Sequence, residues 1–350
     1  MKKNILFVML ILSIFCSLTA ETKLKMELWN RWTYQTEDGV CKKNEMALKR
    51  GYFRLEPTFG NNIKGRFNLD FYSDDDAPTG VRIKLKYAYL DFNNLFPIKD
   101  LKLTAGLMKT YFGTIYSWNY TTIEKDPSDK YKFVSSTDYG VGLSGYFPQG
   151  FGTYQAAVYN GEGYKKTGDD LNKDMNFLVN TRVTPIPGVT FGGSFMMKTA
   201  KDSEIPDSTG TMINNPDREE FLQFAGVGKF AYGSAKLLVQ FLNQTKSKPN
   251  LNDEEDVTKT VISLMPTYKI NNSFDLVARY DIYDPNVDEE NNGKSLLLLG
   301  ANYHIMRDAK NKPKLFVQAN YEIETPENSD KEPVNTIMVQ LRWIFSHKIK

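Results

Sequence analysis

The sequence predicts an all-β fold, a transmembrane antiparallel β-barrel of about 16 strands with short periplasmic turns and long extracellular loops. Three features predict it. Apolar and polar residues alternate along many segments, as they do where successive side chains of a strand point to opposite faces. The candidate strands are mostly 10–13 residues long, close to the ~9–11 residues that a tilted strand needs to cross a bilayer. The connections between them are alternately short and long.

Segment 313–324 shows the alternation, because Leu315 and Val317 are apolar whereas Lys314 and Gln318 are polar. A strand with this pattern has one apolar and one polar face. Along the whole chain the pattern predicts sixteen strands, over 23–34, 46–57, 62–73, 82–93, 100–110, 138–147, 152–161, 174–184, 188–199, 218–230, 234–245, 257–269, 273–283, 294–305, 313–324 and 334–345.

Every second connection is a tight turn, and those between are longer and polar. The short ones are 58–61, 94–99, 148–151, 185–187, 231–233, 270–272 and 306–312. The long ones include 35–45, 111–137, 199–217, 246–256 and 284–293. This asymmetry is typical of outer-membrane barrels, and an even strand number places both termini on the short-turn, periplasmic rim.

A sheet that crosses a membrane is expected to close on itself. Backbone amides in hydrocarbon must be hydrogen-bonded, so a sheet crosses a bilayer only as a closed barrel. Sixteen strands enclose a lumen too wide for side chains to fill, and the alternate polar residues then face water. The pattern therefore predicts a water-filled pore.

The N-terminus predicts export. Lys2 and Lys3 precede an apolar run over 5–15, and the small residue Ala20 follows, which is the pattern of a secretory signal peptide. The run is shorter than the ~20 residues of a membrane-spanning helix. We therefore expect a signal peptide over 1–20, a single barrel domain over 21–350, and a location in the bacterial outer membrane. Cleavage leaves Cys41 as the only cysteine, so no internal disulfide is expected.

Composition argues against other functional classes. The chain has 44 Lys and Arg against 42 Asp and Glu, so no basic excess points to a nucleic-acid partner. Only two histidines, His304 and His347, are present, and neither is placed for a nucleophile–base pair. We expect no enzyme activity and no cofactor. The acidic runs 74–76 and 253–256 could bind calcium, but such runs are more often solvated loop tips.

The loop 111–137 is the longest connection and is rich in aromatic residues. Loops of this length are usually functional. One interpretation is a constriction inside the lumen, where Glu124, Lys125, Asp126 and Lys130 help to select solutes. The other is that the aromatic residues only attach the loop to the wall.

Basic residues occupy many polar-phase positions of the strands. The candidate pore-lining residues among them are Arg31, Arg50, Arg54, Arg66, Lys102, Arg182, Arg279 and Arg342. The wall is therefore mildly basic, while the loops hold compensating acids. The resulting hypothesis is a slight anion preference, or almost none.

Short motifs in order along the mature chain resemble the phosphate-selective porin O and P family of outer-membrane channels. They include Lys49-Arg50-Gly51-Tyr52-Phe53-Arg54-Leu55, Gly106-Leu107-Met108-Lys109-Thr110-Tyr111-Phe112-Gly113 and the ending Val339-Gln340-Leu341-Arg342-Trp343-Ile344-Phe345. The resemblance implies a sixteen-stranded, trimeric, passive diffusion channel. Anion-selective members carry a ladder of arginines, whereas the ten arginines here are scattered without a local run. Phosphate specificity is therefore not carried over.

Two functional interpretations remain. The first is an outer-membrane porin for small hydrophilic solutes or anions, with a weak anion (phosphate-like) preference, whose partners are the lipid bilayer, lipopolysaccharide and two further copies in a homotrimer. The alternative is a non-conducting outer-membrane barrel that acts as a binding or adhesion protein.

Overall fold

The structure is a computed structural model that describes residues 21–98, 100–165, 173–200, 204–206, 208, 211–215, 217–248 and 255–349. The signal peptide expected over 1–20 lies outside these residues. So do Asp253 and Glu254 of the second acidic run.

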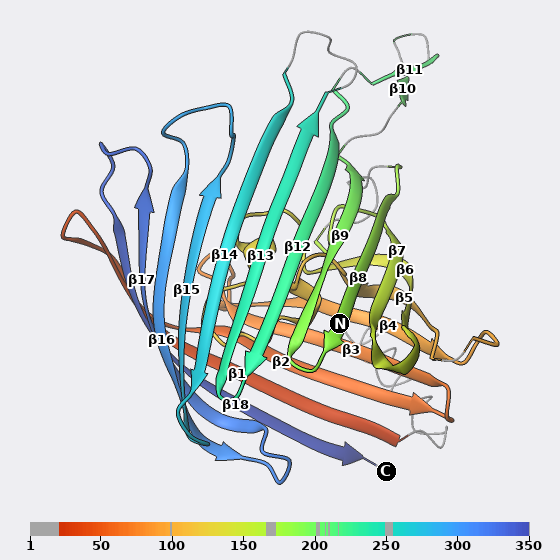
Figure 1. Ribbon diagram of the computed structural model, residues 1–350, viewed down its shortest axis with the longest axis horizontal. Coiled ribbons are helices and arrows are strands. Elements are labelled where there is room, and N and C mark those ends of the chain that lie inside the picture. The colour runs from red at the N-terminus through yellow and green to blue at the C-terminus, as the bar shows by residue number, and fades with distance from the viewer. Residues whose placement is uncertain are drawn as a thin grey trace.

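Strands dominate the described chain, and sixteen of them form one closed antiparallel barrel (Figure 1). In chain order they are β1 (Glu21–Glu37), β2 (Val40–Phe59), β3 (Ile63–Ser73), β4 (Val81–Asn93), β5 (Lys102–Lys109), β6 (Thr137–Tyr146), β7 (Gly152–Tyr159), β8 (Asn176–Ile186), β9 (Val189–Thr199), β12 (Glu220–Tyr232), β13 (Ala235–Ser247), β14 (Val257–Lys269), β15 (Phe274–Asp284), β16 (Lys294–Arg307), β17 (Pro313–Pro326) and β18 (Val334–Ile349).

The first and last strands close the barrel. Each wall strand pairs with its neighbours in sequence, and β1 pairs with β18 from Thr22 opposite Ile349 to Glu37 opposite Val334. The predicted fold class is confirmed, including the strand number. Because closure leaves no edge strand, the wall can lie in hydrocarbon without unpaired backbone groups.

The alternation of side chains along each strand produces an inner and an outer face of the barrel wall. In β16, Leu296 and Leu298 are buried inside the barrel, whereas Leu297 and Leu299 are exposed on its outer face. Many other large apolar side chains are exposed on the outside in the same way, as a lipid-facing surface requires. Within the described residues, no helix is long and apolar enough to cross a bilayer.

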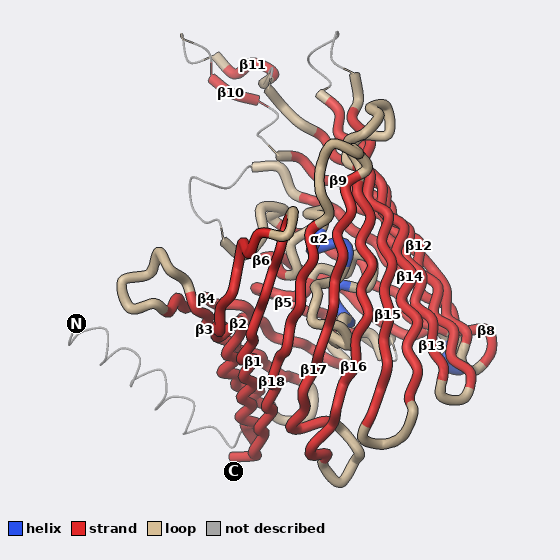
Figure 2. Tube along the Cα trace, turned by 90° about the vertical axis from the view of Figure 1, so that its left-hand side faces the viewer, coloured by secondary structure: helices blue, strands red, loops and turns tan. Residues whose placement is uncertain are grey.

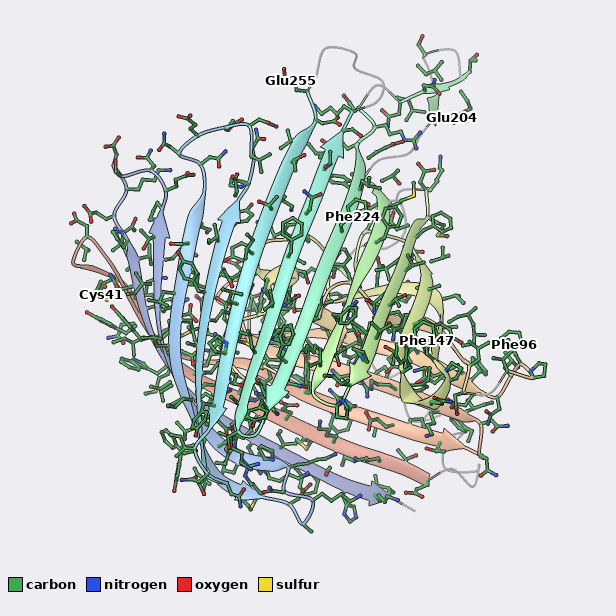
Figure 3. All side chains as sticks on the ribbon, viewed as in Figure 1. Cys41, Phe96, Phe147, Glu204, Phe224 and Glu255 are labelled. Atoms are coloured by element: carbon green, nitrogen blue, oxygen red, sulfur yellow. The ribbon has the colours of Figure 1, made fainter. Side chains whose placement is uncertain are left out.

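The first connection differs from the prediction. A long loop was expected over 35–45, but β1 and β2 continue as a hairpin whose two-residue turn is Asp38-Gly39, with φ of 49° and 67°. Asp-Gly is a preferred pair where both turn residues need positive φ. Cys41 therefore lies in β2, near the tip of the hairpin and exposed (Figure 3).

Other boundaries also shift. Strands β5 and β7 have 8 residues each, fewer than expected. The loop after β9 contains a small hairpin of β10 (Glu204–Pro206) and β11 (Met212–Asn214), which the period-two pattern did not predict. Short η2 (Pro148–Gly150) lies in the turn between β6 and β7.

We expect Gly106→Ala to destabilise the barrel more than Gly39→Ala. Both glycines have positive φ, but a Cβ at Gly39 meets nothing within 4 Å, whereas a Cβ at Gly106 would lie 2.4 Å from the Ala88 carbonyl oxygen of β4. Gly39→Ala should cost about 1 kcal/mol of unfolding free energy through backbone strain. Gly106→Ala should cost at least about 2 kcal/mol, because backbone strain and the contact with β4 add. Urea unfolding followed by tryptophan fluorescence measures both, and equal losses would contradict the packing argument.

Candidate functional site

The loop between β5 and β6 turns into the barrel. It contains η1 (Ile115–Ser117) and α2 (Pro127–Lys130), and α2 lies within the barrel in two perpendicular views (Figures 1 and 2). Residues Phe112 and Phe133 of the loop are almost completely buried. The predicted inward-folded loop is therefore present. It ends at Ser136, one residue before the predicted boundary, because Thr137 begins β6.

An apolar cluster fixes the loop to the inner wall. Tyr111, Phe112, Tyr131 and Phe133 of the loop pack with apolar residues of five wall strands, namely Leu178, Met196, Ala225, Leu242 and Val261. These wall residues occupy inward-facing positions that were expected to be polar. Burying this apolar area from water contributes roughly 25 cal/mol for each Å². The aromatic residues therefore attach the loop to the wall, and the selection of solutes by the loop stays a prediction.

Asp126 caps helix α2. Its Oδ1 accepts a hydrogen bond of 2.9 Å from the Ser128 amide, and Pro127 occupies the first helical position, both favourable at a helix start. Its Oδ2 accepts from Thr114 Oγ1 at 2.5 Å and from Gln240 Nε2 of β13 at 3.4 Å. Burial raises the pKa of this carboxyl. Asp126 is buried, so it holds the loop and does not face the lumen.

Arg279 of β15 is fully buried. It forms a two-pronged ion pair with Asp281, with donor–acceptor distances of 2.9 and 2.6 Å. Its third nitrogen, Nη1, donates to the Lys125 carbonyl oxygen at 2.5 Å. The loop completes the site, since the Tyr131 hydroxyl donates to Asp281 Oδ2 at 3.0 Å. Arg279 thus binds the loop backbone through a fully buried guanidinium.

Arg182 and Arg342 act in the same way. Arg182 Nη2 donates to the Gly113 carbonyl oxygen at 2.6 Å, and Arg342 Nη1 donates to the Tyr120 carbonyl oxygen at 3.1 Å. Both arginines are less than a tenth exposed. Three of the eight predicted pore-lining residues, the arginines at 182, 279 and 342, therefore lie behind the loop. The position of these arginines in the sequence could not show that the loop covers them, because each hydrogen bond joins residues more than 60 positions apart.

The loop's remaining charges form a network at its surface. Lys130 Nζ lies 2.7 Å from Glu124 Oε2 and 3.9 Å from Glu324 Oε2 of β17. Burial would raise the pKa of the Glu124 carboxyl, but the Lys130 ammonium, together with Arg279, holds that pKa at about 2. Lys125 is exposed. Glu124 and Lys130 are thus a fixed ion pair.

Four of the predicted arginines gather on neighbouring strands. Arg31 lies on β1, Arg50 and Arg54 on β2, and Arg66 on β3, and Arg342 is adjacent on β18. The sequence showed no local run of arginines, but the closed barrel brings these positions together. Lys102 of β5 lies further along the wall.

Each of these basic groups has a defined partner. Arg31 Nε donates to Gln340 Oε1 at 2.9 Å. The Arg50 guanidinium stacks on the Trp29, Tyr52 and Tyr120 rings at 4.5–5.1 Å. Arg54, Arg66 and Lys102 are partly exposed and pair with Asn68, Glu56 and Asp91 at 2.8, 2.8 and 3.3 Å, in that order. Arg31 and Arg50 are also only partly buried, so these five wall residues, unlike the arginines at 182, 279 and 342, keep some exposed side-chain surface.

A cavity lies below the loop at the short-turn rim. Its volume is about 860 Å³, and its lining includes Trp118, Asn119, Lys229, Lys236 and Arg307. Lys229 and Lys236 occupy polar-phase positions of their strands, but no local pattern distinguishes them as a site. No ion pair involving either lysine occurs among the described residues.

The other candidate groups lie apart from the loop. His304 Nε2 is 2.6 Å from Asp275 Oδ2 near the short-turn rim. In the first acidic run, Asp74 Oδ2 pairs with Arg82 Nε at 3.0 Å. Across the described residues, no group of three His, Cys, Asp or Glu side chains is arranged to hold a metal ion.

We expect Arg279→Met to release the loop. The change leaves Asp281 as a buried charge without its partner, which typically costs about 3–5 kcal/mol, and removes the bond to the Lys125 carbonyl. Unfolding free energy and protease cleavage within 111–136 measure the two effects. The matched control is Arg279→Met with Asp281→Leu, which leaves no uncompensated charge and should cost less. An equal cost for the single and double variants would contradict this account.

Acid should weaken the attachment of the loop. The folded pKa of Glu124 lies near 2, below its ordinary 4.5, so its ionised form stabilises the folded state above pH 4.5 and this contribution is lost as pH falls from about 4.5 to 2. Glu124 faces Lys130 and Arg279. Protease cleavage of the loop at stepped pH measures the change. Glu124→Gln should flatten the profile within this window, and an unchanged profile would contradict the assignment.

Comparison with solved structures finds the same fold in outer-membrane proteins. The anion-selective porin from Comamonas acidovorans matches with a TM-score of 0.65 and 11% identity, over 93% of this chain and 100% of that one. The outer membrane channel DcaP of Acinetobacter baumannii matches with a TM-score of 0.65 and 11% identity, over 93% and 97%. A loop L8 deletion mutant of OmpT, an outer membrane protein of Vibrio cholerae, matches with a TM-score of 0.63 and 15% identity, over 93% and 99%.

Comparisons with family models and with individually described protein sequences find no match. At identities of 11–15% the likeness to the solved structures is one of fold. The finer resemblance to the phosphate-selective porin O and P family is not confirmed. The chain has the sixteen-stranded barrel fold of outer-membrane porins.

Proposed function

We propose that this protein is an outer-membrane porin that forms a water-filled passive diffusion channel for small hydrophilic solutes. The observation that carries the proposal is the loop 111–136, fixed inside a closed sixteen-stranded barrel whose inner wall keeps charged side chains exposed. A barrel of this size encloses a lumen that side chains alone do not fill. A loop held within that lumen sets its width and charge.

The exposed charges support a weak anion preference. Arg54 and Arg66 on one side of the lumen share a single carboxylate, that of Glu56. Lys229 and Lys236 line the cavity below the loop and take part in no ion pair among the described residues. An excess of fixed positive charge raises the local concentration of anions. No residue is proposed as a dedicated phosphate site, so we expect the channel to prefer phosphate no more than other small anions.

The proposed location is the bacterial outer membrane, reached through a signal peptide over 1–20. The lipid bilayer and lipopolysaccharide then surround the exposed apolar face. We propose a homotrimer, which agrees with the description of one protein of the same fold, OmpT of Vibrio cholerae, as a trimer form. A passive channel of this kind performs no catalysis and needs no cofactor.

A non-conducting binding or adhesion barrel is the second candidate, and one observation favours it. The loop contacts the inner wall at strands as far apart as β8 and β18, so it crosses most of the lumen. Conductance distinguishes the two candidates, because a binding barrel needs no continuous water path.

We expect the purified protein to conduct ions in planar bilayers. Fixed positive charges a few ångströms from a hydrated ion contribute about 1 kcal/mol or less, so chloride should permeate about twofold to fivefold better than potassium. Reversal potentials in a potassium chloride gradient measure the ratio, and added phosphate tests for a specific block. Clear cation selectivity would contradict the anion preference. Absence of channels would favour the binding barrel.

A further inference from the structure

An apolar groove crosses the outer face of the barrel wall near the short-turn rim. Its volume is about 850 Å³, and residues of β8, β9 and β12 through β16 line it. Strands β12 to β16 lie side by side on one wall (Figure 1). Strand pairing places six of the outward lining residues in one row, namely Val189, Phe230, Leu237, Pro266, Ala278 and Leu299.

The middle of this row is the floor of the groove. Pro266 and Ala278 are small, whereas the outward residues two positions further along the same two strands, Tyr268 and Tyr280, are large and lie on opposite sides of the row. The pairing of β14 with β15 is interrupted at 265–266, where the proline has no amide hydrogen to donate. The groove therefore lies over a gap in the hydrogen-bond ladder of the wall.

The row rises from the rim into the bilayer. Val189 follows the turn between β8 and β9 directly, whereas Leu299 lies eight residues before the rim end of β16 at Arg307. Neighbouring strands are ~4.8 Å apart, so the row is ~24 Å long. Because strands of a membrane barrel tilt by ~35–45°, the row rises by about 15 Å. This rise is half of the ~30 Å hydrocarbon core, which is the depth of one leaflet.

A groove in a lipid-facing wall needs an occupant. If it stays empty, its lining loses van der Waals contacts. Lipid tails are as apolar as leucine, so close packing and head-group charge, and no hydrophobic gain, retain a chain there. A flexible acyl chain can follow an oblique groove. The outer face of a second barrel would rest first on the larger side chains Tyr268 and Tyr280, because packed sheets lie ~10 Å apart.

The rim end of the groove suits an anionic head group. Lys236 of β13 lines both the groove and the cavity below the loop, and it forms no ion pair with the part of the chain that the structure describes. Its long side chain can extend toward the head groups, and a lysine at a membrane surface attracts anionic lipids. Tyr232, which is 92% exposed, lines the same end, and tyrosine is typical of the head-group level.

Resting on the outer-membrane location proposed above, we propose that this groove binds one acyl chain of a phospholipid of the periplasmic leaflet, with the phosphate of that lipid at Lys236. The short-turn rim selects this leaflet, since lipopolysaccharide occupies the opposite one. The bound chain packs on Pro266 and Ala278 and covers the wall where the pairing of β14 with β15 is interrupted.

The test maps which wall residues a lipid chain contacts. The protein is inserted into phosphatidylcholine vesicles that contain a small fraction of phosphatidylglycerol with a photoactivatable diazirine on its acyl chain, and peptide mass spectrometry measures the cross-link yield at each outward residue. We expect the yield at Ala278 and Leu299 to exceed severalfold the yield at Val179, an exposed outward residue of β8 outside the groove.

Two pairs of variants test the groove and the charge. Ala278→Trp fills the floor and should lower the yield at Leu299 about fivefold or more, because the ring takes the place of the chain. Its control is Ala156→Trp, the same change at an exposed outward alanine of β7. Lys236→Gln should lower the preference for phosphatidylglycerol over a phosphatidylcholine probe about fivefold. Its control is Lys310→Gln, at an exposed position of another short turn.

The wild-type map needs no variant, so it decides the proposal even if a variant fails to fold. Cross-links spread evenly over the outer wall would overturn the proposal, as would a variant that behaves like its control. Cross-links that reach other strands but avoid β13 to β16 would also overturn it, because a second copy then covers the groove. Each of these results leaves the channel function intact, which conductance tests separately. A protein that does not insert into vesicles would remove both proposals.

Discussion

Pairing of backbone amides is the constraint on which the whole structure depends. Hydrocarbon supplies no hydrogen-bonding partner, so every wall strand must be paired on both sides. The continuous register of β1 with β18 meets this requirement, and the rest follows from closure. Antiparallel closure with an even strand number places both chain ends on one rim. Alternation of side chains then places apolar residues on the lipid face, while the inner face carries polar residues and, under the loop, the apolar cluster.

The need for hydrogen-bonding partners also applies to the loop inside the barrel. A loop in the lumen carries peptide groups that have no sheet partners, and buried ones must be hydrogen-bonded. Side chains of the wall provide the missing donors, such as Arg182 to Gly113, Arg279 to Lys125 and Arg342 to Tyr120. The polar inner face therefore serves two purposes. It contacts water where the loop is absent, and it completes the loop's hydrogen bonds where the loop is present.

The sequence was sufficient for the features that depend on local pattern. Period-two alternation and turn chemistry predicted the barrel and the sixteen strands, and the length of the segment 111–137 led to an inward loop as one of two interpretations. The tight turn at Asp38-Gly39 could also have been predicted from its residue pair. Contacts between the loop and the wall could not be predicted, because partners such as Gly113 and Arg182 lie 69 positions apart. No local pattern distinguishes an inward arginine that meets water from one that meets a loop carbonyl.

Whether an inward arginine meets water or a loop carbonyl determines which charges are exposed in the lumen. Arg279 and Arg66 both occupy inward positions of wall strands, yet Arg279 is fully buried against Asp281 and a loop carbonyl, whereas Arg66 pairs with Glu56 and stays partly exposed. The charge that a passing ion meets is therefore not the sum of all inward residues. It is the part that the loop leaves uncovered. Because the apolar cluster and the buried arginines fix the loop in one position, that uncovered part is set by packing. In the proposed channel, the charges that the loop covers therefore matter as much as the charges that it carries.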